Sequence, residues 1–328
     1  MKKIAFIVPF FGKLPDKGFE LWLHSCHFND SIDWILYTDD RTRYNYPNNV
    51  IVNYCTLEDI KKRAQQCFDF NISLERPRKL CDFRPAYGEI FADELSSYDF
   101  WGYCDIDLVW GDIRHFINDN ILEKYDRIGY QGHCQLYRNS PEVNKRYRTI
   151  IDGINNYKMV FSDPGEYIFD ENGMDGIYNA LTIPYYKETI FAHLNKYDYG
   201  FFLAYLPEKD DYKNKHQVFV LDSGKLLRKY ETENVVYTEE FMYLHFFCRP
   251  IRFKLNDINS GDRFLIYADS VIKLKSEVTA KLIRKYSNNT AFHYYSTSIW
   301  YNRKKLTFAR VIANVERMIQ KKKGKRNL

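Results

Sequence analysis

The first third of the chain alternates short apolar runs with polar loops. Residues 3–8 (KIAFIV) form a continuous apolar run that Pro9 ends, which is typical of a buried strand in a parallel sheet. Such patterns predict strands at 3–8, 32–37 and 50–54, and helices at 19–26 and about 57–67. This order is typical of an open α/β sheet, in which ligands bind beyond the carboxyl ends of the strands. The loops at 9–13 and 38–43 are therefore candidate parts of a ligand site.

The pattern continues with an aromatic strand that begins at Tyr98 and ends among carboxylates. Other predicted elements are helices at 81–95, 113–125, 175–181, 276–286 and about 303–320, and strands at 127–131 and 134–138. Polar turns and short strands over 201–237 suit a meander or an inserted flap.

Composition narrows the class of protein. Hydrophobic residues make up 45% and charged residues 28% of the 328 residues, which excludes wholesale disorder. The seven cysteines are scattered with no C-x-x-C pair, which excludes a zinc ribbon or a disulfide scaffold and favours the reducing cytoplasm. The apolar start MKKIAFIVPFFG is interrupted by Pro9 and Gly12 and lacks a cleavage site, so we do not expect a signal peptide. No run of about 18 apolar residues predicts a membrane span.

The net charge of +5 hides an asymmetry. Residues 303–328 contain ten basic residues and one acidic residue, whereas the rest of the chain has a net charge of −4. A net negative charge over most of the chain is not typical of a nucleic-acid-binding domain. The basic tail instead predicts contact with an anionic partner.

The strongest chemical signal is Asp105-Ile106-Asp107 at the end of the aromatic strand. Two carboxylates one residue apart on an extended backbone point to the same side, so both can bind one divalent cation. Mg²⁺ and Mn²⁺ favour such oxygen ligands. The alternative is a solvated strand edge without a metal.

Two further polar clusters flank this motif. Lys79 and Arg84 can hold a diphosphate, and Asp82 can accept hydrogen bonds from sugar hydroxyls, although a charged helix start would look the same. The stretch 163–175 is rich in carboxylates that can serve as a general base or simply form an exposed acidic loop: Asp163, Glu166, Asp170, Glu171 and Asp175.

Histidines add one candidate ligand. His245 lies in an apolar run, where it is either a hydrogen-bonded core residue or a third ligand for the metal of Asp105 and Asp107. His133 is a candidate pocket residue. The remaining histidines, His193 among them, show no ligand spacing to one another.

These blocks resemble the GT-A-fold glycosyltransferases, and in particular bacterial members from capsule and O-antigen loci assigned as galactofuranosyltransferases. The similar blocks are KIAFIVPFFG, WILYTDD, KLCDFRPAYG, YDFWGYCDIDLVWGD, GHCQLYRN and the late LHF, which span roughly residues 1–250. The resemblance implies an α/β GT-A fold, with a Rossmann-like, mostly parallel sheet flanked by helices. It also implies a catalytic domain at 1–250. The remaining residues, 251–328, form an extension that the pattern of the tail predicts to end in a basic amphipathic helix.

The resemblance further implies roles for individual residues. Mn²⁺ or Mg²⁺ would be bound by Asp105, Asp107 and His245. The base of an inverting reaction would be Asp170, or else Glu171 or Asp175. In a retaining reaction this assignment of a base would not apply. The residues expected around the UDP-sugar are Phe10, Phe11, Gly12, Thr38, Asp39, Asp40, Lys79, Asp82, Arg84, Asp105 and Ile106.

The expected activity is therefore transfer of a sugar, with UDP-galactofuranose as the favoured donor, to a bacterial surface polysaccharide. The acceptor would be linked to undecaprenyl diphosphate, and the basic tail would hold a cytoplasmic enzyme on the anionic inner leaflet. The alternatives are a haloacid-dehalogenase-like phosphatase, a sugar nucleotidyltransferase, or a carbohydrate-binding module without catalysis. No nucleic-acid partner is expected.

Overall fold

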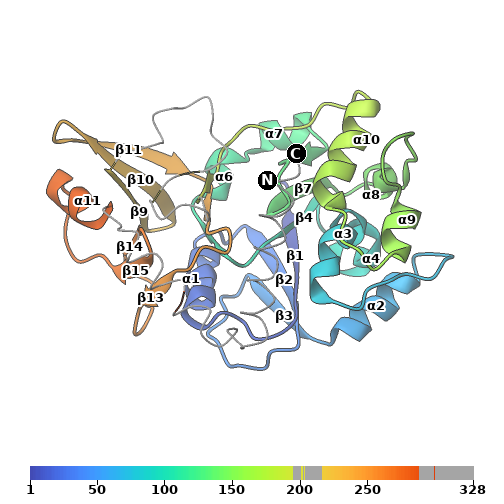
Figure 1. Cartoon of the computed structure of the whole chain (residues 1–328), viewed down its shortest axis with the longest axis horizontal. Helices are drawn as coiled ribbons and strands as arrows, with labels where there is room; N and C mark the ends of the chain where they lie inside the picture. The colour runs from blue at the N-terminus through green and yellow to red at the C-terminus, as the bar shows by residue number, and fades with distance from the viewer. Residues whose placement is uncertain (195–200, 202, 204–215, 288–298, 300–328) are drawn as a thin grey trace, which may run out of the picture.

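The computed structural model describes residues 1–194, 201, 203, 216–287 and 299, and these residues form three sheets. The central sheet has the strand order β3-β2-β1-β4-β7-β6 (Figure 1). Its strands are β1 (Ile4–Phe10), β2 (Ile32–Thr38), β3 (Val50–Tyr54), β4 (Phe100–Cys104), β6 (Arg127–Ile128) and β7 (Cys134–Arg138). The first four strands in this order are parallel, and β7 is antiparallel to both of its neighbours. The expected mostly parallel α/β sheet is therefore confirmed.

Alternating side chains of β1 bury the two faces of this sheet. Ile4 and Phe6 join the core formed with helix α1 (Asp16–His27), whereas Ala5 and Ile7 join the core on the opposite face. This is the period of two that a buried strand requires.

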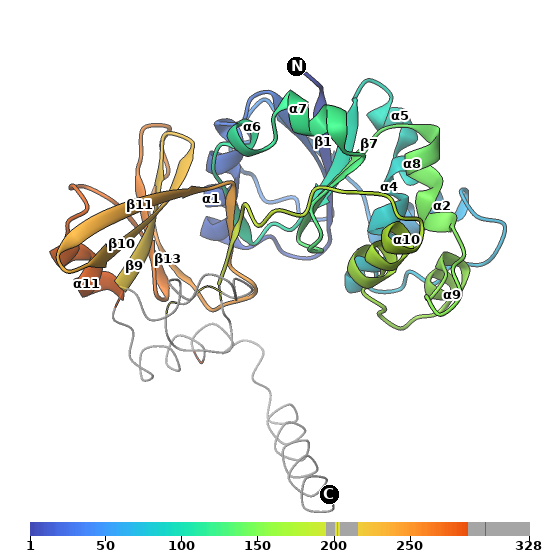
Figure 2. The same cartoon turned by 90° about the horizontal axis from the view of Figure 1, so that it is seen from above.

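Short helices cover the face opposite α1, and Figures 1 and 2 show them gathered on one side of the molecule. They are α2 (Leu57–Gln65), η1 (Pro77–Lys79), α3 (Leu80–Phe83), η2 (Arg84–Ala86), α4 (Tyr87–Ile90), α5 (Ala92–Leu95), α8 (Pro141–Lys145), η3 (Arg146–Arg148), α9 (Tyr157–Ser162), η4 (Phe169–Gly173) and α10 (Met174–Ala180).

Two predicted helices are divided in the structure. The expected helix at 81–95 is a series of short turns, because Pro85 cannot donate a helical hydrogen bond and a new 3-10 turn begins there. The expected helix at 113–125 is split into α6 (Ile113–Phe116) and α7 (Asp119–Lys124), since the Asn118 side chain caps α7 by accepting from the backbone N–H of Ile121.

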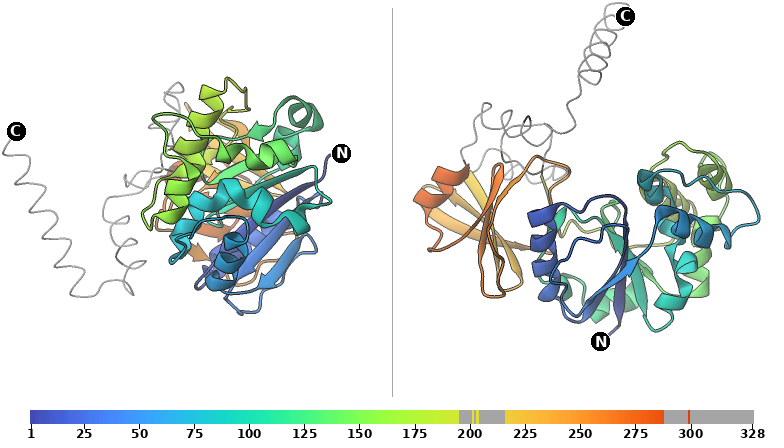
Figure 3. Two further views of the ribbon diagram at one scale, coloured as in Figure 1. Left: turned by 90° about the vertical axis from the view of Figure 1, so that its right-hand side faces the viewer. Right: turned by 90° about the horizontal axis from the view of Figure 1, so that it is seen from below.

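A second sheet lies on the far side of α1 (Figure 3). Its order is β11-β10-β9-β14-β15-β13, from β9 (His216–Asp222), β10 (Lys225–Thr232), β11 (Val235–Phe241), β13 (Arg252–Lys254), β14 (Phe264–Tyr267) and β15 (Ser270–Lys273). Consecutive antiparallel pairing of β9, β10 and β11 confirms the predicted meander. One face packs on Leu21 of α1, and the other packs on Ile283 of α11 (Ala280–Ser287). This sheet takes strands from both sides of residue 250, the expected end of the catalytic domain.

A small third sheet connects the two larger ones. It consists of β5 (Leu108–Trp110), β12 (Tyr243–His245) and β8 (Ala192–His193). β12 is antiparallel to β5 and parallel to β8, so that His245 lies opposite Leu108 on one side and His193 on the other. Strand pairing thus places His245 next to the segment that begins with Asp105.

The basic tail and its predicted helix at about 303–320 lie outside the described residues. In the part of the chain that the structure describes, no helix has the length and apolar character needed to cross a membrane.

Candidate functional site

Asp105 and Asp107 lie in the turn between β4 and β5, at the carboxyl end of the central parallel strands. Both side chains are about one third exposed, whereas Ile106 between them is buried in the core. Asp105, Asp107 and His245 each place one ligand atom within 4.8 Å of the other two. The three residues for which the sequence predicts a metal therefore meet in one place.

His245 directs one ring nitrogen at the two carboxylates. Its Nε2 atom lies 3.2 Å from Asp107 Oδ1 and 3.8 Å from Asp105 Oδ2. The backbone N–H of Cys248 donates to the other Asp107 oxygen at 3.0 Å. Burial acts to raise the pKa of Asp107, but His245 and the Cys248 N–H outweigh it and lower the pKa to about 2. Asp107 is therefore ionised at neutral pH and can bind a cation.

The turn that supplies this N–H is strained. Phe247 and Cys248 both adopt the left-handed conformation, with φ of 53° and 54°. Two successive non-glycine residues in this region are costly, and such strain gathers at functional sites. Here it aims the Cys248 N–H at the Asp107 carboxylate.

Arg84 joins a third aspartate to the cluster. Its Nη1 donates to Asp170 Oδ2 at 3.0 Å and to the carbonyl oxygen of Gly132 at 2.6 Å, while its Nη2 pairs with Asp105 Oδ1. A planar guanidinium has donors in a fixed fork, which holds the two carboxylates at defined positions.

Asp170 and Glu171 belong to the π-helical turn η4, which follows Ile168 with a left-handed φ of 54°. A π turn and a β-branched residue at positive φ are both uncommon outside functional sites. Burial raises the pKa of Asp170 to about 7, with Glu171 adding to the rise and Arg84 opposing it. Asp170 can therefore gain or lose a proton near neutral pH. Burial also raises the pKa of Glu171.

Gly132 allows this loop to approach. Its N–H donates to Glu171 Oε1 at 2.7 Å, and a Cβ atom at this position would lie 2.6 Å from that oxygen and 2.8 Å from Asp170 Oδ2. Any side chain here would push the two carboxylates away.

The other predicted base lies apart from Arg84. Asp175 pairs with the fully buried Arg127 at 2.6 Å. Asp163 accepts from the backbone of Gly165, and Glu166 pairs with Arg78, also at 2.6 Å. Within the acidic stretch it is Asp170 that forms an ion pair with Arg84.

The loops after β1 and β2 are tied together. The N–H of Gly12, with φ of 101°, donates to Asp39 at 2.7 Å, and the N–H of Leu14 donates to Asp40 at 2.8 Å. The buried Thr38 hydroxyl accepts from the N–H of Asp40. Phe11 is buried, whereas Phe10 is partly exposed at the same edge. These loops flank the carboxyl end of β4, because β1 pairs with both β2 and β4.

Lys79 and Asp82 are engaged within the protein. Lys79 Nζ donates to Asp82 at 2.9 Å, to the carbonyl of Val160 at 2.7 Å and to that of Gly165 at 2.5 Å. These contacts occupy all three donors of the ammonium group. The pair therefore joins the helical segment 77–90 to α9 and to the loop that follows it, and this conformation leaves Lys79 no donor for a diphosphate.

His193, which was not predicted as a site residue, lies beside His245 with the two Nδ1 atoms 3.1 Å apart. His133 contacts both of these rings: its Nε2 lies 3.4 Å from His193 Nδ1, and its ring centroid lies 4.2 Å from that of His245. Burial lowers the pKa of His133 well below its ordinary value. Sequence spacing could not show these neighbours, because they meet only through the pairing of β8 with β12. Gly132 was also missed, although its place directly before His133 offered a signal.

Comparison with known proteins gives a family and a distant structural match. The model of a family of unknown function, DUF6625, matches residues 6–275. A crystal structure of the catalytic domain of Drosophila β1,4-galactosyltransferase 7 in complex with xylobiose matches with 14% identity and a TM-score of 0.28. The match covers 57% of this chain and 65% of that one, a similarity too low to establish a shared fold or activity. No curated protein matches the sequence.

Proposed function

The chain belongs to DUF6625, a family of unknown function, and we propose that it is a metal-dependent glycosyltransferase that uses a nucleoside diphosphate sugar. The observation that carries the proposal is the meeting of Asp105, Asp107 and His245 at the carboxyl edge of a parallel sheet. This is the edge at which open α/β sheets bind their ligands.

The donor set suits a divalent cation such as Mn²⁺ or Mg²⁺. Asp105 and Asp107 supply carboxylate oxygens that hard cations prefer, and the imidazole of His245 favours Mn²⁺ of the two. When bound, such an ion would neutralise the charge that develops on a diphosphate leaving group. Arg84 balances only part of the charge of Asp105 and Asp170, so the cluster favours binding of a cation.

Asp170 is the proposed general base. A base works best when its pKa lies near the working pH, and the pKa of Asp170 is raised to about 7. The ionised carboxylate would take the proton of an acceptor hydroxyl, while Arg84 holds it in place. Glu171 is the alternative, because it reaches the same backbone at Gly132.

The proposed nucleotide site lies along the neighbouring loops. Phe10 ends β1, Gly12 follows it and Asp39 follows β2, and all three lie at the carboxyl edge of the sheet, where Asp105 follows β4. A partly exposed aromatic ring can stack on a base, and the carboxylate can accept from ribose hydroxyls.

The resemblance of the sequence blocks extends the proposal to particular substrates. We propose UDP-galactofuranose as the donor, a lipid-diphosphate-linked glycan as the acceptor, and an inverting reaction. The basic segment 303–328 would contact an anionic membrane surface. These finer assignments rest on the sequence blocks and on the charge of the tail.

The first experiment measures UDP release from a panel of UDP-sugars, UDP-galactofuranose included, with Mn²⁺ and a glycan acceptor. We expect release from one donor, and a loss of about 100-fold or more in Asp107→Asn, since a metal contributes several kcal/mol to such a step. The exposed Asp30→Asn is the matched control and should behave as the wild type.

Two outcomes would contradict the proposal. One is the absence of both release and a donor-induced rise in melting temperature with every nucleotide sugar. The other is release of inorganic phosphate from phosphate monoesters, which would favour a phosphatase.

A further inference from the structure

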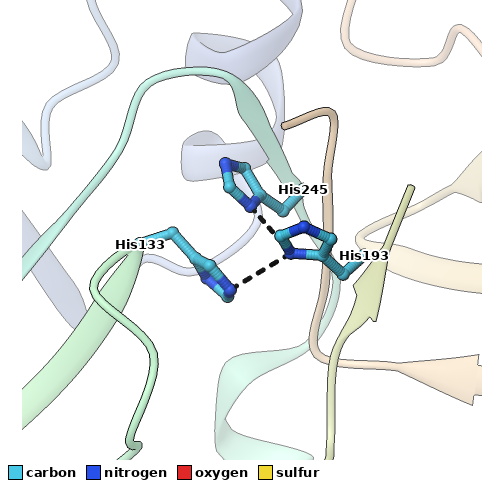
Figure 4. Close-up of side chains that lie close together, drawn as sticks. All are labelled: His133, His193 and His245. Carbon is cyan, nitrogen blue, oxygen red and sulfur yellow. Dashed lines mark hydrogen bonds between the residues drawn. The ribbon is translucent and has the colours of Figure 1, made fainter. Parts of the chain in front are cut away.

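Three buried histidines converge in the structure (Figure 4), and one of them is the His245 that contacts Asp107. His133 directly precedes β7, His193 lies in β8 and His245 lies in β12. Their exposed fractions are 5%, 2% and 4%. Three separate segments of the chain thus direct imidazole rings to one point, and the proposed reaction uses only His245.

The spacing of their nitrogens matches a metal site. His193 Nδ1 lies 3.1 Å from His245 Nδ1 and 3.4 Å from His133 Nε2, and each histidine places a ring nitrogen within 4.8 Å of the other two. Tetrahedral zinc with bonds of about 2.0–2.1 Å to nitrogen requires neighbouring ligand nitrogens about 3.3 Å apart. Two of the three edges therefore already have the required length.

On His133 and His245 the opposite ring nitrogen has a partner of the kind that orients a metal ligand. His133 Nδ1 lies 3.0 Å from the hydroxyl of Tyr243, and His245 Nε2 lies 3.2 Å from Asp107 Oδ1. A histidine that binds metal through one nitrogen usually donates its other N–H to a carboxylate or a similar acceptor. When His245 binds a metal through Nδ1, its Nε2–H donates to the Asp107 carboxylate in this way.

The surroundings favour a borderline metal over a hard one. The inward-facing donor set is nitrogen only, which suits Zn²⁺, Co²⁺ or Ni²⁺ better than Mg²⁺ or Ca²⁺. The rings of Phe191 and Phe247 pack against His133 and His193, with ring centroids 4.9 and 4.3 Å away. Such an apolar shell limits access of water to the site.

We infer that His133, His193 and His245 form an inner binding site for Zn²⁺ or a similar divalent metal, separate from the outer site of Asp105 and Asp107. Three protein ligands leave one tetrahedral position for water or another ligand. The two sites share His245, and a neutral imidazole has only one lone pair for coordination. A metal in the inner site therefore takes His245 away from the outer one.

One consequence rests on the proposed function. If Mn²⁺ at the outer site supports sugar transfer, occupancy of the inner site by Zn²⁺ should weaken Mn²⁺ binding and slow the reaction. The inner site itself does not depend on the proposed reaction, and its binding can be measured without any substrate.

The test titrates the metal-free, full-length protein with Co²⁺, whose absorption reports tetrahedral coordination. We expect one equivalent of Co²⁺ with intense visible bands that Zn²⁺ abolishes. His193→Gln should weaken binding at least about 100-fold, since loss of an outer partner alone costs 10- to 100-fold. Asp105→Asn, which alters only the outer site, and the exposed His115→Gln should both keep the bands.

A second variant guards against loss of folding in His193→Gln. Tyr243→Phe keeps all three histidines, removes only the hydroxyl near His133 and should weaken Co²⁺ binding about 10-fold or more. Tetrahedral bands that persist in His193→Gln would overturn the inference. So would Co²⁺ binding that Asp105→Asn alone removes, or an absence of tetrahedral binding in the wild type. Failure of the proposed function would appear separately, as no Mn²⁺-dependent turnover in protein that still binds Co²⁺.

Discussion

The buried pair Lys79–Asp82 makes a prediction that separates a structural role from a role in donor binding. In Lys79→Met, Asp82 loses its ion-pair partner at 2.9 Å, and the carbonyl oxygens of Val160 and Gly165 lose a donor. Asp82 is only 2% exposed, so water cannot replace the ammonium group. The backbone N–H groups of Tyr167 and Phe169 still donate to Asp82, at 3.2 and 3.0 Å, but two backbone dipoles do not cancel a full charge.

The expected cost follows from this burial. Removing one partner of a buried ion pair lowers the free energy of unfolding by about 3–5 kcal/mol, because the remaining charge is left uncompensated. The matched control is Lys61→Met, whose partner Glu75 is 64% exposed, and a surface pair of this kind contributes less than about 1 kcal/mol. The double variant Lys79→Met/Asp82→Leu should be more stable than Lys79→Met alone, since no charge remains buried.

Urea unfolding followed by tryptophan fluorescence measures these differences, because the described tryptophans are all buried: Trp22, Trp34, Trp101 and Trp110. The reasoning is refuted if Lys79→Met costs no more than Lys61→Met. A stable Lys79→Met protein with greatly weakened UDP binding would instead support the role at a diphosphate that the sequence pattern suggests.

Four further predictions concern the residues around Asp170 and Arg84. Transfer activity should rise with pH around a midpoint near 7 in a pH–rate profile, because Asp170 must be ionised to accept a proton, and Asp170→Asn should abolish this step. The free energy of unfolding of the wild type, relative to that of Asp170→Asn, should fall as pH rises from about 4 to about 7. The reason is that the raised pKa keeps the carboxyl protonated over this range in the folded state only. An equal dependence of the free energy of unfolding on pH in both proteins would contradict this. Gly132→Ala should lower stability by about 1–3 kcal/mol in thermal melts, because its methyl group meets carboxylate oxygens at 2.6 and 2.8 Å, whereas Gly261→Ala, with no atom within 4 Å, should be neutral. Arg84→Lys should reduce kcat about 10-fold or more with an unchanged melting temperature, since an ammonium group cannot hold Asp105 and Asp170 in one plane. An unaltered kcat would show that the reaction does not depend on Arg84.

Local patterns predicted the central sheet well. The apolar runs at 3–8 and 32–37 specify buried strands through their own composition, and the structure has β1 and β2 there. The placement of Asp105 and Asp107 after a strand was equally visible, because both the strand and the carboxylates lie within one short segment.

Features that depend on distant partners were not predictable in this way. The role of Lys79 depends on carbonyl groups more than 80 residues away, and a lysine that binds a phosphate has the same sequence signature. His193 joins His245 only through the pairing of β8 and β12, which no spacing rule expresses. The division of the predicted helix at 81–95 could have been expected from Pro85, whose missing N–H disfavours a continuous helix.

The position of β12 also has a consequence for how the protein acquires its site during synthesis. Asp107 and His245 are 138 residues apart, and the N–H of Cys248 that contacts Asp107 comes later still. The central sheet can form before most of the second sheet has left the ribosome. At that stage Asp105 and Asp107 are in place, but His245 is not yet beside them. Because closure of so long a loop is slow, we expect the three ligands Asp105, Asp107 and His245 to come together late in folding, after the loops that follow β1 and β2 have formed. A nascent or partly degraded chain would then compete poorly with the complete protein for the cell's metal ions.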